Sequence, residues 1–112
     1  MNMNLEVDVV EEGSAAMIYL AGEIDAYTAP NLKETLLYFT TKQGQKIEVN
    51  LEKVSYMDST GLGAFISALK SSKEYNSELK LVQLQDKVRR LFDITGLDNV
   101  ITIDSTVRGG NG

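Results

Sequence analysis

The sequence predicts a single α/β domain in which helices pack on a mixed, mostly parallel β-sheet. Three observations lead to this prediction. The 112 residues are about the length of one domain. Apolar residues alternate with polar ones in some stretches and recur every three or four residues in others. These two patterns follow one another in the order β-β-α-β-α-β-α-β, which is typical of parallel strands joined by right-handed helical crossovers.

The chain opens with a predicted hairpin. Apolar residues alternate with acidic ones at Leu5, Val7 and Val9, a pattern that indicates a half-buried strand. Gly13 and Ser14 are a turn signal, and a second alternating stretch covers residues 16–20. We therefore expect the first strand to be an antiparallel edge of the sheet.

A connection over residues 22–29 leads to the first predicted helix, whose start is marked by Thr28 and Pro30. Leu32, Leu36 and Phe39 recur at helical spacing, and the pattern fades before Gly44. The next strand is predicted over residues 47–51, followed by a connection over residues 52–57.

Asp58, Ser59 and Thr60 open the second predicted helix, whose apolar face is formed by Leu62, Phe65, Ile66 and Leu69. A strand is then expected over residues 78–84. Gln85 and Asp86 mark the start of a third helix with Val88, Leu91 and Phe92 on its buried face, and Gly96 suits its left-handed end. A short strand over residues 100–103 completes the domain, which we place at residues 1–106, with residues 107–112 as a flexible tail.

Composition excludes several classes of function. Sixteen acidic residues against eleven basic ones give a net charge of −5, which disfavours binding to nucleic acid or to anionic membranes. Cysteine and histidine are both absent, so thiolate or imidazole catalysis and zinc sites built from those residues are excluded. We expect a protein that is not an enzyme and needs no cofactor or metal.

The amino terminus lacks a targeting signal. Residues 1–12 carry four acids and no base, which is the opposite of a signal peptide. No apolar run approaches the length of about 18 residues that a membrane helix needs. We expect a soluble cytoplasmic protein.

Residues 54–65 are the most informative stretch, because Asp58, Ser59 and Thr60 crowd the first turn of a helix. The backbone N–H groups of such a turn favour an anion, so a phosphate on the serine would be accommodated there. Gly61 and Gly63 would let another protein approach the backbone. The simpler interpretation is that Asp58 or Ser59 only caps the helix. The glycine spacing does not match a nucleotide-binding loop.

A second candidate is the loop before the first helix, where Asp25 lies near Tyr27, an aromatic residue that we expect to be exposed. Connections at the same end of a parallel sheet cluster together, so this loop could form a recognition surface beside Ser59. The alternative is a loop that merely leads into the helix, shaped by Thr28 and Pro30. Arg89 and Arg90, in the third helix, are typical of a solvated face.

Three blocks of the sequence resemble the STAS domain family, and specifically its bacterial anti-sigma factor antagonists. They are residues 21–30 (AGEIDAYTAP), residues 54–63 (VSYMDSTGLG) and residues 90–97 (RLFDITGL). The blocks stand in the family's order, and the resemblance covers about residues 1–106. They are more similar to the stress-response antagonists than to the sporulation ones.

The resemblance implies a partner switch that regulates transcription. The unphosphorylated antagonist binds an anti-sigma factor that is also a serine kinase, and thereby releases a sigma factor. The kinase phosphorylates the serine that follows the aspartate of the second block, here Ser59, and a PP2C-type phosphatase resets it. The resemblance, together with the two candidate loops, assigns partner binding to Asp25, Tyr27, Asp58, Thr60, Gly61 and Leu62.

Two other functions stay open from the sequence alone. The chain could be a stand-alone STAS ligand-binding or scaffold module without a phosphorylation switch, since a fold does not determine function. It could also be an aspartyl-phosphate receiver, because Asp58 follows a strand, although residues 22–25 are a poor version of a receiver's acidic magnesium pair. A phosphoserine survives acid, whereas an acyl phosphate is labile to hydroxylamine.

Overall fold

The computed structural model describes residues 5–104 and confirms the predicted order of strands and helices. The predicted tail, residues 107–112, lies outside the described residues. The elements are β1 (Leu5–Glu12), β2 (Ala15–Ile24), α1 (Ala29–Thr40), β3 (Lys46–Met57), α2 (Ser59–Tyr75), β4 (Glu78–Val82), α3 (Asp86–Thr95), the short 3₁₀ helix η1 (Leu97–Asn99) and β5 (Thr102–Asp104).

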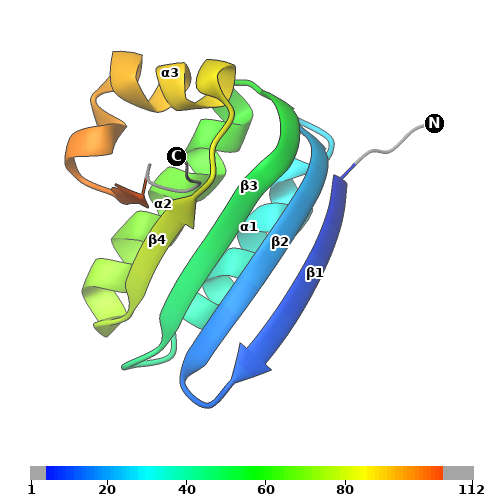
Figure 1. Ribbon diagram of the computed structural model, residues 1–112. Helices are drawn as coiled ribbons and strands as arrows, with labels where there is room; N and C mark the ends of the chain where they lie inside the picture. Colours follow the sequence, from blue (N-terminus) through cyan, green and yellow to red (C-terminus); the bar gives the residue numbers. More distant parts are fainter. Residues whose placement is uncertain (1–4, 105–112) are drawn as a thin grey trace.

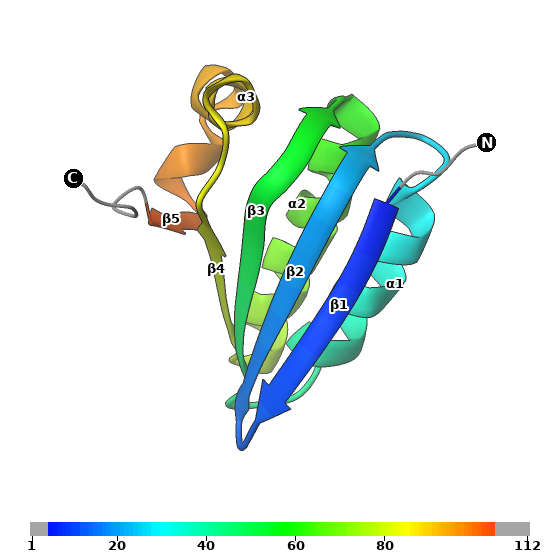
Figure 2. The same ribbon diagram turned by 45° about the vertical axis from the view of Figure 1, so that its right-hand side comes forward.

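The described strands form one five-stranded sheet in the order β1-β2-β3-β4-β5. β1 is antiparallel to β2, and every other neighbouring pair is parallel, as predicted. Figures 1 and 2 show α1 and α2 side by side on one face of the sheet. No helix of the described residues covers the opposite face of β1, β2 and β3, called here the open face (Figure 1).

The core lies between the sheet and these two helices. Ile18 of β2 and Val49 of β3 are fully buried, as are Leu36 of α1 and Phe65 of α2. In α3, Phe92 is also fully buried, and its ring meets that of Phe65 edge-on with 5.9 Å between centroids. This contact ties the third helix to the second.

The predicted connection over residues 52–57 is wrong, because β3 continues through it to Met57. The pairing of β3 with β2 shifts register twice along this stretch. Each shift adds a residue to β3 and breaks the alternation of buried and exposed side chains, which is the signal that a strand prediction uses. Asn50 stabilises the first shift, since its Oδ1 accepts a hydrogen bond of 2.9 Å from the backbone N–H of Glu52.

Other element boundaries also differ from the predictions. β2 continues to Ile24, and β4 ends at Val82 because the next residue, Gln83, has a φ of 59° that leaves the extended conformation. The last strand lies at Thr102–Asp104 instead of residues 100–103, because η1 follows α3 directly. Gly96 has the predicted left-handed conformation, with a φ of 77°.

The predicted apolar faces are largely confirmed. In α2 the buried face includes Leu62 and Phe65, whereas Ile66 and Leu69 are half-buried and Ala68 takes the deeper position. In β1, which lies at the edge, Val9 is exposed although it alternates as expected. Edge strands have a neighbour on one side, so their apolar residues are covered less completely.

Candidate functional site

Two of the predicted loops meet at one edge of the sheet, where β2 and β3 end. Ile24 and Met57, the last residues of these strands, pair with each other. The backbone N–H of Asp58 donates a hydrogen bond of 3.2 Å to the carbonyl oxygen of Ile24. The loop that contains Asp25 therefore lies beside the turn that contains Ser59, as the sequence predicted.

Asp58 is the residue that starts α2. Its backbone is extended, with φ −114° and ψ −172°, and its Oδ1 accepts hydrogen bonds from the N–H groups of Thr60 at 3.0 Å and Gly61 at 3.2 Å. This satisfies two donors that the first turn of a helix leaves unpaired. The predicted cap is thus confirmed, and Ser59 becomes the first residue of the helix, with its side chain exposed.

Gly61 has a different role from the one that the sequence suggested. It is buried, and a Cβ atom at this position would lie 2.6 Å from Cγ2 of Ile24 and 2.8 Å from Cγ of Met57. The missing side chain therefore lets α2 pack against the ends of β2 and β3, and does not open the backbone to another protein. Gly63 has no atom within 4 Å of its Cβ position and fits the original interpretation.

Hydrogen bonds within the loop before α1 fix its shape. Oδ1 of Asp25 accepts hydrogen bonds from the backbone N–H groups of Tyr27 at 2.9 Å and Thr28 at 3.1 Å. Oγ1 of Thr28 accepts one from the N–H of Asp25 and donates one to the carbonyl of Glu23, both 2.9 Å. Asp25 is half-buried in these contacts, so it organises the loop that presents Tyr27, whose side chain is 93% exposed.

The predicted partner-binding residues divide into two groups. Asp25 and Asp58 are half-buried, while Tyr27 and Thr60 are exposed around Ser59. Gly61 and Leu62 are buried beneath them. A partner that binds at this edge would contact residues of the first group. Gly61 and Leu62 would not contact the partner; they hold the first group in place by packing beneath it.

A groove lies between the start of α1 and the first turns of α2, and its lining begins at Thr60, the residue after Ser59. It is lined by Ala29, Pro30 and Lys33 of α1 and by Thr60, Gly63, Ala64 and Ser67 of α2. Lys33 could not be predicted as a site residue from the sequence, because its position on the polar face of α1 has no distinctive local pattern. Only the packing of the two helices brings it to the groove.

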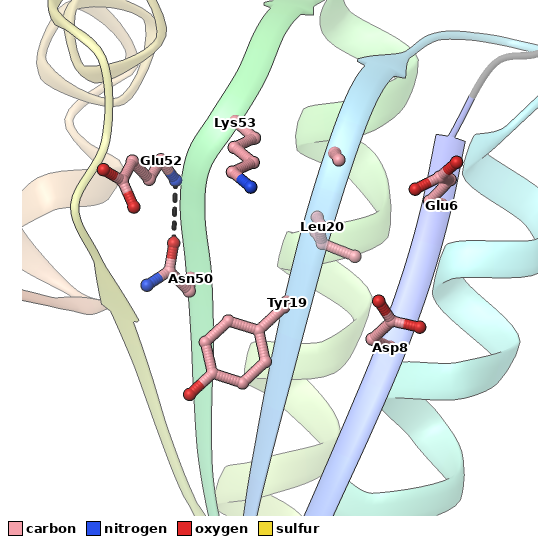
Figure 3. Close-up of a pocket in the computed structure, with 8 residues that line it drawn as sticks. Glu6, Asp8, Tyr19, Leu20, Asn50, Glu52 and Lys53 are labelled. Carbon is pink, nitrogen blue, oxygen red and sulfur yellow. Dashed lines mark hydrogen bonds between the residues drawn. The ribbon is translucent and has the colours of Figure 1, made fainter.

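A second hollow lies on the open face of the sheet (Figure 3). Ala21 forms its floor between Glu6 of β1 and Lys53 of β3, which pair with Ala21 from its two sides. The next row places Tyr19 between Asp8 and Asn50. The sequence analysis also missed this feature, which depends on the register of three strands.

No helix in residues 5–104 is both long enough and apolar enough to span a membrane.

Comparison with known proteins agrees with the predicted resemblance. The model of the STAS domain family matches residues 6–110, and the chain belongs to this family. Within it, the chain is similar to curated proteins named anti-sigma-B factor antagonist. The protein from Listeria monocytogenes is 46% identical over 98% of this chain and 97% of the relative. The protein from Bacillus subtilis is 44% identical over 96% of this chain and 98% of the relative.

Solved structures share the fold. An anti-sigma factor antagonist from Mycobacterium paratuberculosis superposes with a TM-score of 0.80 at 21% identity, covering 92% of this chain and 87% of that one. The antagonist SpoIIAA in its unphosphorylated form gives a TM-score of 0.73 at 20% identity, covering 90% of each chain. At these identities the similarity shows the α/β architecture and confirms the predicted fold class.

Proposed function

We propose that this chain is an anti-sigma factor antagonist whose binding is switched by phosphorylation of Ser59. In its unphosphorylated form it binds, in the cytoplasm, an anti-sigma factor that is also a serine kinase, and so releases a sigma factor. A PP2C-type phosphatase restores this form. The names of the relatives that are 44–46% identical over nearly the whole chain support the antagonist role.

The observation that carries the switch is the exposure of Ser59 at the first position of α2. The Asp58 cap holds the turn, so a kinase meets the hydroxyl in a defined place. In the reaction, Oγ of Ser59 forms a bond to the γ-phosphorus of ATP, and the bond between that phosphorus and the oxygen bridging to the β-phosphate breaks. ADP leaves, and the proton of the serine hydroxyl passes to the kinase.

Electrostatics explains how one modification could dissociate the complex. A phosphate adds a charge of about −1.5 to −2 at neutral pH. It would stand beside the carboxylates of Asp58 and Asp25, on a chain whose net charge is already −5. A partner surface that fits the neutral serine would remove water from this phosphate without supplying a positive charge to pair with it. If this desolvation costs about 2.8 kcal/mol, the affinity falls a hundredfold.

The test combines the purified chain with the anti-sigma factor of its own organism and Mg-ATP, followed by intact-protein and peptide mass spectrometry. We expect one phosphate, on Ser59. Ser59→Ala should remove it. Ser55→Ala is the matched control, because Ser55 is also exposed and lies four residues earlier, in β3.

Phosphate on another residue would contradict the assignment of Ser59. If the chain binds the anti-sigma factor and stays unmodified while that kinase modifies an established antagonist, the switch is absent. The chain would then be a STAS module that binds without regulation. Phosphate that is lost in hydroxylamine would instead indicate an aspartyl-phosphate receiver.

A further inference from the structure

Among residues 5–104, Lys33 has no ion-pair partner, and it lies at the groove near Ser59. It is exposed on α1 and lines the groove together with Thr60 and Gly63 of α2. The salt bridges within residues 5–104 join other charges, Lys80 to Asp104 and Arg89 to Asp93. The ammonium group of Lys33 is therefore available to an anion that enters the groove.

Ser59 lies close to the groove that Lys33 lines. Ser59 and Gly63 are four residues apart and lie on the same side of α2, so the serine stands one turn from a residue that lines the groove. Gly63 has no side chain, and apart from its chain neighbours and its own helix backbone no atom lies within 4 Å of its Cβ position, so the groove is open at this residue.

α1 and α2 also begin at the same edge of the sheet (Figure 2). Side chains of a helix generally lean toward its amino terminus, and for Lys33 this is the direction of the edge where Ser59 lies.

We propose that Lys33 is a positioning residue of the switch: its ammonium group binds the phosphate carried by Ser59 and holds it over the mouth of the groove. This inference rests on the proposed phosphorylation of Ser59. Phosphorylation would then change two surfaces at once. The phosphate would alter the turn itself, and together with Lys33 it would cover the small residues that line the groove.

The other charges considered on the loop before α1 and along α2 oppose this contact or lie too far along the helix to replace it. Asp58 and Asp25 carry negative charge and repel a phosphate. Lys70, the nearest base along α2, is eleven residues after Ser59, which corresponds to about 16 Å along the helix. This exceeds the Debye length of about 8 Å at physiological ionic strength.

The test measures the second pKa of the phosphate by a ³¹P NMR titration. Phosphoserine is installed at position 59 by semisynthesis, so the experiment does not depend on a kinase. A nearby ammonium favours the dianion and lowers this pKa, so Lys33→Met should raise it, by about half a unit. Lys33→Arg, which keeps the charge, should restore the low value.

Lys70→Met is the matched control, since it removes the same charge from an exposed position on the same helix as the phosphate. We expect it to leave the phosphate pKa unchanged. Circular dichroism of each variant checks that the fold is retained. If the second pKa of the phosphate is equal in the folded Lys33→Met and Lys70→Met variants, the proposed role of Lys33 is contradicted. Failure of the kinase to modify Ser59 would instead contradict the proposed function.

Discussion

At the scale of single residues, Asp58 and Gly61 together determine where α2 begins. The carboxylate of Asp58 binds two N–H groups of the first turn, and the absent side chain of Gly61 lets that turn contact Ile24 and Met57. Both residues act on Ser59, which lies between them. Asp58 and Gly61 are therefore needed in the block of residues 54–63 to start and pack α2, whether or not they contact a partner.

Gly61→Ala should destabilise the protein by about 1–3 kcal/mol, because the new methyl group overlaps Ile24 and Met57 and the core must shift to admit it. Gly63→Ala is the control. Its Cβ enters open space, and replacing a helical glycine by alanine should stabilise by about 0.5–1 kcal/mol. Urea unfolding followed by circular dichroism measures both. Equal losses of stability would contradict the packing role of Gly61.

Asp58→Ala should cost about 1 kcal/mol of stability, since the N–H groups of Thr60 and Gly61 lose their acceptor. Asp58→Asn keeps an oxygen acceptor and removes the charge, and it should retain most of the stability. Thermal unfolding of the two variants separates the cap from the charge. If both variants were equally destabilised, the charge and not the cap would dominate.

At the scale of elements, α3 is joined to the rest of the domain by a few specific contacts. Phe92 packs on Phe65 of α2. Gln85, the residue before α3, makes no cap hydrogen bond with its side chain; its Nε2 donates one of 2.9 Å to the carbonyl of Glu52. That carbonyl lies at the first register shift of β3, so the irregular part of the strand also anchors the third helix.

Phe92→Ala should therefore cost about 3–5 kcal/mol, the usual loss for a fully buried aromatic ring. Ile94→Ala, two residues later on the same helix, is the control. Its side chain is 73% exposed, and the change should stay within about 0.5 kcal/mol. Chemical denaturation gives both values. A small loss in Phe92→Ala would show that α3 contributes little to the core.

At the scale of the whole molecule, the candidate site lies at one edge of the sheet and the core lies between the sheet and helices α1 and α2. Ser59, Thr60 and Tyr27 are exposed at that edge. A charge added to Ser59 therefore stays in water and does not enter the core. Binding and folding should respond separately to it.

Ser59→Glu should reduce affinity for the anti-sigma factor by up to about a hundredfold, equivalent to about 2.8 kcal/mol, and leave the melting temperature nearly unchanged. Isothermal titration calorimetry and thermal unfolding provide the two readouts. Ser55→Glu places the same charge on the nearby exposed serine and should bind normally. Unchanged binding of Ser59→Glu would favour a module that lacks the switch.

The sequence by itself predicted the order of the elements, the parallel inner sheet and the Asp58 cap. These features depend on local patterns: alternation in strands, helical spacing of apolar residues and the side chains at helix ends. Three blocks of sequence, residues 21–30, 54–63 and 90–97, carried the resemblance to the STAS family. The prediction failed along residues 52–57, because the two register shifts of β3 remove the alternation that identifies a strand.

Tertiary structure alone decided the role of Gly61, the position of Lys33 and the hollow on the open face. Each depends on residues distant in sequence: Gly61 on the end of β2, Lys33 on the packing of α1 against α2, and the hollow on three strands in register. The physical reason is that a local sequence sets the conformation of a segment, whereas close packing between segments sets which side chains meet.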